Sequence, residues 1–429
     1  MKSLRNTALC LAVGVAGATA ANAGELTIAT VNNGHMIEMQ KLTPKFEAAN
    51  PGITVKWVTL DEGTLRSRVT TDITTKGGQF DIMTIGMYEA PIWGSRGWLE
   101  ALEFGAEYDV DDILPAMRGG LSHEGKLYAA PFYGESSMIM YRKDLLDAAG
   151  MTMPDNPSWG HVQDAAAAMT DKAAGQYGIC LRGKPGWGDN MAFLTTMANS
   201  FGAQWFNEDW TPALDSAAWN HAVTFYKSLL DNYGPPGSSA NSFNEILALM
   251  NEGKCGMWID ATIAASFLTN ENMAYAQAPQ AVTSRGSNWL WAWSLAVPAG
   301  TKQKADAMKF MEWATSKSYI ELVAETNGWG KVPTGTRTST YKNPKFLAAA
   351  GFAGAELKAI LSADPSNSTQ NPSPYTGVQF AAIPEFQAIG TAVGQQMTAV
   401  LAGDISVEEG LANAQAAADR EMKKGGYYK

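Results

Sequence analysis

Strand-like and helix-like patterns alternate along this chain, and the alternation limits the folds open to it. Residues 25–31 alternate apolar and polar side chains, residues 36–50 repeat apolar residues at helical spacing, and residues 53–57 alternate again. A strand, a helix and a strand in this order predict two parallel strands joined by a crossover helix. A second helix is expected at 63–76, followed by a buried strand at 80–86.

The same alternation continues towards the C-terminal end. Further strands are expected at 127–132, 178–182, 255–259 and 291–297. Alanine-rich stretches predict helices at 161–174, 217–232, 304–316 and 408–423. The predicted class is therefore α/β, with open parallel sheets flanked by helices.

The first 23 residues have the composition of an export signal. A basic start and an apolar run at 8–20 lead to the small residues 21–23, the pattern that signal peptidase recognises. The run is shorter than the roughly 20 apolar residues that span a bilayer. We predict cleavage after Ala23, a periplasmic mature protein, and no lipid on Cys10.

Size and charge restrict the remaining chain, residues 24–429. It exceeds the roughly 250–300 residues at which a single hydrophobic core stops growing, so two lobes are expected. The whole chain carries a formal net charge of −10, and cleavage would also remove Lys2 and Arg5. This acidity argues against a nucleic-acid partner, which needs a basic patch.

Cysteine and histidine are scarce. Cys180 and Cys255 are the cysteines left after cleavage, and two interpretations stay open: a disulfide, which export allows, or two buried thiols. The four histidines do not pair with each other or with cysteine at metal-ligand spacing. We expect neither a metal nor a cofactor.

Aromatic residues are unusually numerous, with 14 tryptophans and 14 tyrosines. These side chains join a flat apolar face to a polar tip, which suits the C–H faces and hydroxyls of sugars. The alternative is that most of them pack in the core.

No catalytic motif is matched in full, and the nearest match lacks a required residue. Residues 178–185 (GICLRGKP) nearly match a phosphate-binding loop, but Pro185 has neither the hydroxyl that binds magnesium nor a backbone N–H. The 42 acidic residues guarantee accidental carboxylate pairs, so a glycosidase pair has little sequence support.

A series of short segments resembles, in order, the sugar-binding proteins of ABC importers, the cluster that includes maltose-binding proteins. The segments are 80–84 (FDIMT), 96–102 (RGWLEAL), 125–131 (GKLYAAP), 141–145 (YRKDL), 157–159 (PSW), 252–258 (EGKCGMW) and 293–301 followed by 307–311 (AMKFM). Within this family, residues 133–136 (YGES), 289–293 (WLWAW) and 327–333 (NGWGKVP) are most similar to the sorbitol- and mannitol-binding branch.

The resemblance implies a type II periplasmic binding fold with two lobes, each holding a central open sheet, and a ligand cleft between them. The first lobe would hold residues 24–132 and about 290–333. The second would hold about 133–289 and 334–429. The resemblance also implies a monomer that binds a small neutral polyol or sugar by lobe closure and delivers it to a membrane permease.

The residues expected at the ligand follow strand ends and chain crossings, because ligands of open α/β sheets bind beyond the carboxyl ends of strands. They are Asn32, Asn33, Tyr88, Glu89, Tyr133, Glu135, Arg182, Trp187, Asp260, Trp293 and Trp329.

The polar candidates have stated roles and alternatives. The Arg182 guanidinium is expected to bridge the polyol and the Asp260 carboxylate; the alternative is an internal salt bridge. Glu135 is expected to accept from two hydroxyls; the alternative is a structural hinge. Asn32 and Asn33 are expected to meet hydroxyls, unless one of them caps the next helix.

The aromatic candidates have alternatives of the same kind. Tyr88 is expected to stack and Glu89 to accept hydroxyl hydrogens; the alternative is a pair on the lobe surface. Trp187 shares a loop with the arginine candidate. Trp293 is expected to line the cleft, unless it packs between the lobes. Trp329 is expected to stack on the ligand, since Gly328 and Gly330 leave it room.

The predicted function involves capture without chemistry. Two alternatives stay open: the same fold with a disaccharide or oligosaccharide ligand, and a secreted carbohydrate-active enzyme. Such an enzyme requires a suitably placed carboxylate pair or a base with a catalytic pKa.

Overall fold

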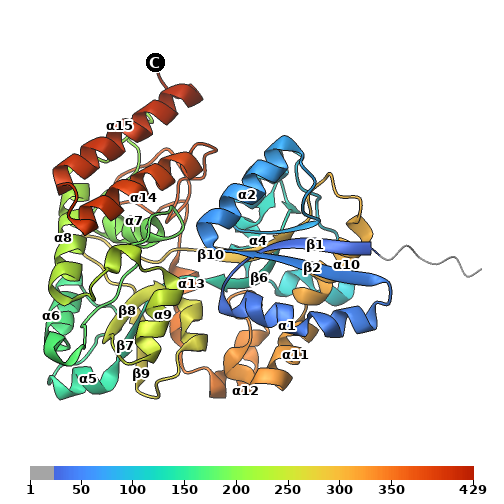
Figure 1. Cartoon of the computed structure of the whole chain (residues 1–429), viewed down its shortest axis with the longest axis horizontal. Coiled ribbons are helices and arrows are strands. Elements are labelled where there is room, and N and C mark those ends of the chain that lie inside the picture. The colour runs from blue at the N-terminus through green and yellow to red at the C-terminus, as the bar shows by residue number, and fades with distance from the viewer. Residues whose placement is uncertain (1–23) are drawn as a thin grey trace, which may run out of the picture.

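The computed structural model describes residues 24–429, which form two bodies side by side (Figure 1). The first body holds a five-stranded sheet with the order β2-β1-β3-β10-β6. Its strands are β1 (Gly24–Val31), β2 (Ile53–Leu60), β3 (Ile82–Ile85), β6 (Ala130–Glu135) and β10 (Trp291–Ala296). The export signal predicted at 1–23 lies outside the described residues.

The strand–helix–strand prediction for the N-terminal part is confirmed. β1 pairs in parallel with β2 along its whole length and with β3 at two positions. The crossover helix α1 (Gly34–Ala49) is capped by Asn33, and α2 (Glu62–Thr75) is capped by Asp61. Both helices follow the carboxyl ends of neighbouring parallel strands, so their first turns lie at the same edge of the sheet.

The first sheet is not parallel throughout, and the prediction of parallel sheets is wrong here. β10 runs antiparallel to both β3 and β6. The route of the chain explains this direction: β6 leaves for the second body at Ser136, and the chain returns from that body directly into β10. Parallel neighbours need a crossover connection of their own, and this return path does not supply one.

The second body holds a smaller, antiparallel sheet with the order β8-β7-β9. Its strands are β7 (Ser137–Arg142), β8 (Met257–Ala261) and β9 (Met273–Gln277). The segment 178–182, expected as a strand, makes only an isolated parallel bridge from Cys180 to Trp258 beside β8. A short hairpin of β4 (Ser122–His123) and β5 (Lys126–Leu127) precedes β6.

Helices flank both sheets (Figure 1). The four alanine-rich helices predicted from the sequence are present as α6, α8, α10 and α15, but α6 ends at Ala168, before the expected end at 174. The bounds of the helices beyond α1 and α2 are α3 (Glu89–Ser95), α4 (Pro115–Gly120), α5 (Lys143–Ala148), α6 (Trp159–Ala168), α7 (Asn190–Ser200), α8 (Ala217–Tyr233), α9 (Phe243–Asn251), α10 (Lys304–Ala314), α11 (Lys317–Asn327), α12 (Pro344–Ala349), α13 (Ala353–Ser362), α14 (Phe386–Ala402) and α15 (Val407–Gly425).

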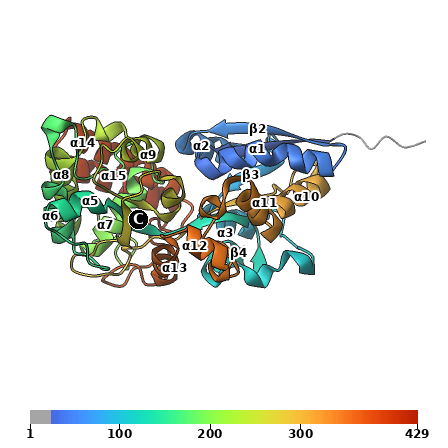
Figure 2. The same cartoon turned by 90° about the horizontal axis from the view of Figure 1, so that it is seen from below.

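The segment between α11 and α13 stays with the first body before the chain crosses again. The buried Arg337 guanidinium donates to the carbonyl oxygens of Asp109 and Thr315, both at 3.1 Å. The helix α13 packs instead against β7 and β9 of the second body. Figure 2 shows α12 beside the first body and α13 beside the second.

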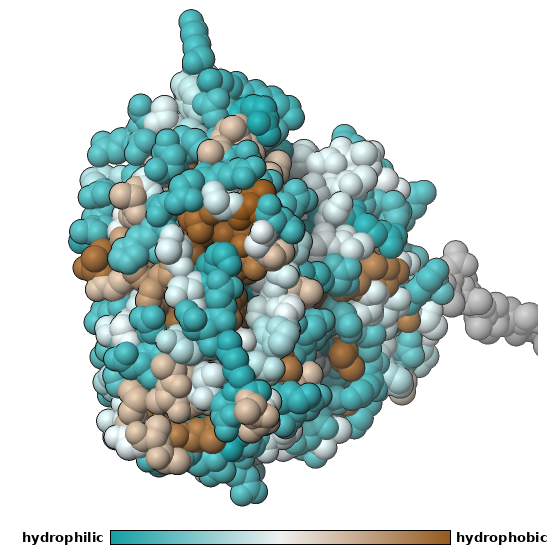
Figure 3. Space-filling view, turned by 60° about the vertical axis from the view of Figure 1, so that its left-hand side comes forward, coloured by the Kyte–Doolittle hydropathy of each residue, from teal (hydrophilic) through white to brown (hydrophobic). Residues whose placement is uncertain are grey.

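The surface is largely hydrophilic, with apolar residues in separate patches on the face seen in Figure 3. Four large apolar side chains of residues 24–429 are well exposed: Ile37, Val282, Leu347 and Leu361. No helix within this range combines the length and the apolar composition needed to cross a membrane.

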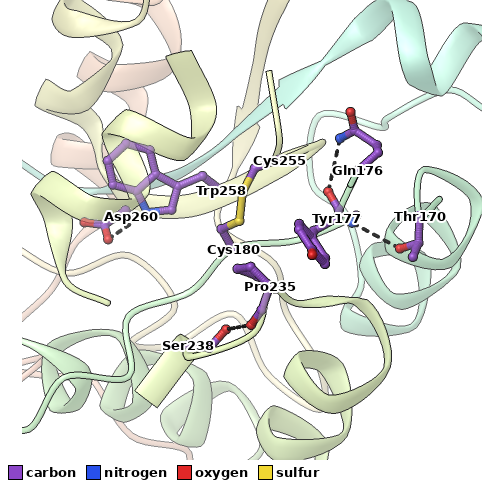
Figure 4. The surroundings of a disulfide bond; sticks show 10 residues. Thr170, Gln176, Tyr177, Cys180, Pro235, Ser238, Cys255, Trp258 and Asp260 are labelled. Atoms are coloured by element: carbon purple, nitrogen blue, oxygen red, sulfur yellow. Dashed lines mark hydrogen bonds between the residues drawn. A yellow bond between two sulfur atoms is a disulfide. The ribbon is translucent and has the colours of Figure 1, made fainter. Parts of the chain in front are cut away.

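A disulfide joins Cys180 to Cys255 inside the second body (Figure 4). Their Cα atoms lie 6.1 Å apart, and both side chains are buried. Trp258 lies beside the bond, and its indole N–H donates to the Asp260 carboxylate at 2.9 Å. The disulfide therefore ties the segment that carries Arg182 to the strand that carries Asp260.

Candidate ligand-binding site

A cavity of about 180 Å³ lies between the two bodies. Strand ends of the first sheet, the first turns of α2 and α9, and the loop before α7 meet there. The lining includes seven predicted residues: Asn32, Asn33, Tyr133, Glu135, Arg182, Trp187 and Trp293. Other lining residues with polar or aromatic side chains are Asp61, Glu62, Arg66, Lys184, Asp189, Ser242, Phe243, Asn244, Glu245, Trp289, Trp291 and Gln379.

Two buried carboxylates face this cavity. Burial raises the pKa of Glu135 well above its usual range, although the charge of Arg182 opposes the shift. Burial raises the pKa of Asp189 to about 6, and the neighbouring charge of Glu62 acts in the same direction. The Ser242 hydroxyl donates to Asp189. The two carboxyl groups place hydrogen-bonding oxygen atoms beside the cavity.

Arg182 lines the cavity while its other edge is fixed by Asp260. Nε donates to Oδ2 at 2.7 Å, Nη2 donates to Oδ1 at 2.6 Å, and Nη1 donates to the carbonyl oxygen of Gly188 at 3.0 Å. Asp260 also accepts from the indole of Trp258 and from the amide of Ala261. The acceptor sites of the carboxylate are therefore filled by the protein itself, which leaves Asp260 as a support for Arg182.

A second buried arginine, Arg66 on α2, was not identified from the sequence. Its guanidinium donates to Glu62 and Glu89, each at 2.7 Å. Its Cζ lies 3.9 Å from the centre of the Trp187 ring and 4.8 Å from that of Trp291. Glu89 thus binds Arg66 and does not line the cavity.

Tryptophan side chains line the cavity, and two of them carry an indole nitrogen that has no hydrogen-bond partner in the described part of the chain. The indole nitrogens of Trp187 and Trp289 are buried and have no hydrogen-bond partner among residues 24–429. Both side chains line the cavity. An unpaired buried N–H carries a desolvation cost, so these donors favour a ligand with acceptor oxygens.

The two predicted asparagines serve the fold as well as the cavity. Asn33 caps α1 through its Oδ1 atom, as the alternative stated, and its Nδ2 donates to the Tyr133 hydroxyl at 2.5 Å. The carbonyl oxygen of Asn32 accepts from Asn244 of the second body at 2.9 Å. Capping and cavity lining are therefore compatible at this strand end.

Four predicted residues lie outside the cavity lining: Tyr88, Glu89, Asp260 and Trp329. The Tyr88 hydroxyl donates to the carbonyl oxygen of Pro384 at 3.0 Å. Trp329 lies in a short 3-10 turn on another surface, near Glu321.

Hydrogen bonds between the bodies close the cleft around the cavity. They join Tyr88 to Pro384 (3.0 Å), Asn244 to Asn32 (2.9 Å) and Thr70 to Gln387 (3.1 Å).

Within residues 24–429, no group of three or more His, Cys, Asp or Glu side chains is arranged to hold a metal ion.

Comparison with known proteins identifies the family of this chain. Residues 33–321 match the model of the bacterial extracellular solute-binding protein family. The chain belongs to this family. The resemblance identified from the ordered sequence segments is thereby confirmed.

Relatives and solved structures cover nearly the whole chain of this solute-binding protein. A mannitol-binding protein of Pseudomonas aeruginosa is 50% identical over 430 residues, with 98% of each chain covered. An ABC transporter solute-binding protein of Agrobacterium vitis S4, crystallised with bound D-mannitol, is 57% identical with a TM-score of 0.93, covering 94% of this chain and 100% of that one. This structural neighbour confirms the predicted fold class.

A more distant structure extends the comparison. The solute-binding protein of Agrobacterium radiobacter K84 in complex with ribitol is 25% identical with a TM-score of 0.81, covering 92% of this chain and 98% of that one.

Proposed function

We propose that this solute-binding protein holds D-mannitol or a similar acyclic alditol in the cavity between its two bodies. The mixture of polar donors and acceptors in the cavity lining carries the proposal. Trp187 and Trp289 offer unpaired N–H donors, and Glu135 and Asp189 offer carboxylate oxygens. A ligand with many hydroxyls, each both donor and acceptor, matches such a mixed lining.

The size of the cavity favours a single small molecule. A bound water requires roughly 10–15 Å³ of comparable space, so about 180 Å³ accommodates roughly 12–18 atoms of that size. A hexitol has twelve non-hydrogen atoms, and a disaccharide has about twice as many. The D-mannitol in the Agrobacterium vitis structure is a hexitol of this size.

The proposed mechanism is closure without chemistry. An open form admits the alditol, side chains such as Arg182 replace its hydration shell, and closure buries it. A ligand that lacks one hydroxyl leaves a buried polar group unpaired, which gives selectivity. We propose no catalytic role, since the relatives named above are solute-binding proteins.

The two bodies correspond to the two lobes in this proposal. Sheet membership favours a first crossing after Glu135, and the contacts of Arg337 favour a third crossing near residue 350. Both positions lie slightly later than the boundaries expected at 133 and 334. We also propose export to the periplasm, with cleavage after Ala23, and a membrane permease as partner.

Titration calorimetry with D-mannitol, sorbitol, ribitol, maltose and D-mannose tests the proposal. We expect the alditols to bind with micromolar dissociation constants, about −8 kcal/mol, and maltose to give no heat. The Arg182→Ala variant should lose alditol binding, whereas Arg142→Ala, which breaks an ion pair with Asp144 away from the cavity, should keep it. Binding of maltose with no response to any alditol would refute the proposal. Turnover of a saccharide would favour the carbohydrate-active enzyme instead.

A further inference from the structure

A thin wall divides the cavity from an open groove of about 590 Å³. Five residues line both spaces: Glu62, Arg66, Trp187, Gly188 and Asp189. A change in these side chains would join the two spaces.

The wall is assembled from both bodies. Arg66 on α2 presses its guanidinium against the Trp187 ring, with 3.9 Å from Cζ to the ring centre. Glu62 fixes this guanidinium through hydrogen bonds of 3.0 Å to Nε and 2.7 Å to Nη2. A Cβ added to Gly188 would lie 1.9 Å from the Glu62 carboxylate, so the two bodies meet closely here. The wall is therefore complete only when the bodies are closed.

Trp187 cannot easily swing aside. Its ring centre lies 5.1 Å from that of Tyr88 and 5.7 Å from that of Trp291, and the side chain is 3% exposed. Helix α14 approaches its stem so closely that a Cβ on Gly390 would lie 2.7 Å from the Trp187 Cβ. These contacts from several directions hold the indole in place.

The groove beyond the wall is rich in small polar side chains. Ser67 and Thr70 on α2 face Gln387 and Thr391 on α14 across it, and Thr70 donates to Gln387 at 3.1 Å. Hydroxyl and amide groups of this kind can exchange hydrogen bonds with the hydroxyls of a sugar ring.

We propose that Trp187, held by Arg66, limits the ligand to one unbranched alditol, and that the groove behind it is a latent site for a glycosyl unit attached to that alditol. This inference rests on the proposed alditol binding. The wall acts as a repulsive element: a longer ligand enters the open form but prevents closure.

Calorimetry with D-mannitol and glucosyl-mannitol tests the wall. The dissociation constant of the wild-type protein for D-mannitol should be at least about 100-fold lower than that for glucosyl-mannitol. Trp187→Ala should reduce this preference to below about tenfold. Trp329→Ala, which removes a tryptophan far from both spaces, should leave the preference unchanged. In the Trp187→Ala background, Thr391→Trp should fill the groove and restore the preference.

The possible outcomes separate this inference from the proposed function. Failure of wild-type protein to bind any alditol overturns the alditol proposal. If the wild-type protein binds glucosyl-mannitol with an affinity within tenfold of that for D-mannitol, the proposed exclusion by the wall is wrong, and no variant is needed to show it. Trp187→Leu replaces Trp187→Ala if the latter does not fold, and a circular dichroism spectrum like that of the wild-type protein identifies a usable variant. A usable variant that still excludes glucosyl-mannitol also overturns the wall.

Discussion

Arg182 and Asp260 form a buried two-pronged ion pair, with 2.7 Å between Nε and Oδ2 and 2.6 Å between Nη2 and Oδ1. The side chains are 7% and 0% exposed. Asp260 accepts two further hydrogen bonds, from Trp258 and from the Ala261 amide. The pair therefore orients the guanidinium towards the cavity and offsets its buried charge.

Replacement of Asp260 by Asn should destabilise the protein strongly, because Arg182 would keep a buried charge without a counter-ion. Loss of one partner from a buried pair typically costs about 3–5 kcal/mol. Urea denaturation followed by circular dichroism measures the free energy of unfolding. Asp147→Asn, which breaks the exposed pair with Lys143, should change it by less than about 1 kcal/mol. Equal effects of the two substitutions would contradict the role of Asp260.

The Arg182–Asp260 pair was predictable, but its consequence for the ligand was not. Both residues lie at expected strand ends, and the internal salt bridge, one of the alternatives stated from the sequence, is present. The contact of Arg182 with a ligand stays a prediction. Asp260 points to Arg182 because Trp258 and the Ala261 amide fill its remaining acceptor sites. Sequence spacing does not reveal such saturation.

Arg66, in contrast, was not identified from the sequence, although it lies in the cavity lining. Asn32 was selected because it follows the carboxyl end of a strand. Asp61 and Glu62 follow the end of the next strand, so the same rule would have predicted that the start of α2 lines the cavity. Arg66 itself lies one turn into that helix, where an arginine usually faces solvent. In the structure it is buried against Trp187 of the second body and against Trp291 and Glu89 of the first.

The fold was predictable to the level of element order but not of strand direction. Alternation along 25–86 carries the period of each element and produced β1, α1, β2 and α2 correctly. The tryptophan-rich strand β10 has the same apolar pattern whichever way it runs. Its antiparallel pairing follows from the return of the chain across the cleft, a long-range property.

Gly335 should tolerate no side chain, because the segment that follows α11 touches β6 there. Its φ is +75°, and an added Cβ would lie 2.0 Å from the Gly134 carbonyl oxygen. Gly237 has the same φ but open space around it. Gly237→Ala should cost about 1–2 kcal/mol from the left-handed backbone alone, whereas Gly335→Ala should cost at least about 1–3 kcal/mol more from overlap. Comparable denaturation midpoints for the two variants would show that the backbone around Gly134 and Gly335 shifts to accommodate a side chain without a measurable loss of stability.

The disulfide should stabilise the second body. Its cysteines are 75 residues apart, and closure of a loop of this size restricts the unfolded chain by about 4 kcal/mol in the chain-entropy model. The double variant Cys180→Ala with Cys255→Ala should therefore unfold at lower urea concentration. Dithiothreitol should lower the midpoint of the wild-type protein and leave that of the variant unchanged. A wild-type protein indifferent to the reductant would contradict this prediction.

Glu356 should make stability depend on pH near neutrality. Its buried carboxylate accepts from Thr334 at 2.8 Å, Tyr341 at 2.6 Å and Thr262 at 3.1 Å, and it has no ion-pair partner among residues 24–429. Burial raises its pKa from 4.5 to about 7, against the lowering effect of these hydroxyls. Because the folded pKa lies above the unfolded value, the stabilising contribution is complete below pH 4.5 and is lost as the pH rises through 7.

The Glu356→Gln variant isolates this contribution, since glutamine keeps an acceptor oxygen but does not titrate. A shift of this size corresponds to a linkage on the order of 3 kcal/mol. Between pH 5 and pH 8, the free energy of unfolding of the wild-type protein should therefore fall relative to that of Glu356→Gln by roughly 2–3 kcal/mol. The difference between the two proteins cancels the other groups with raised pKa, such as Asp189. Parallel pH profiles would show that Glu356 titrates at its unfolded value.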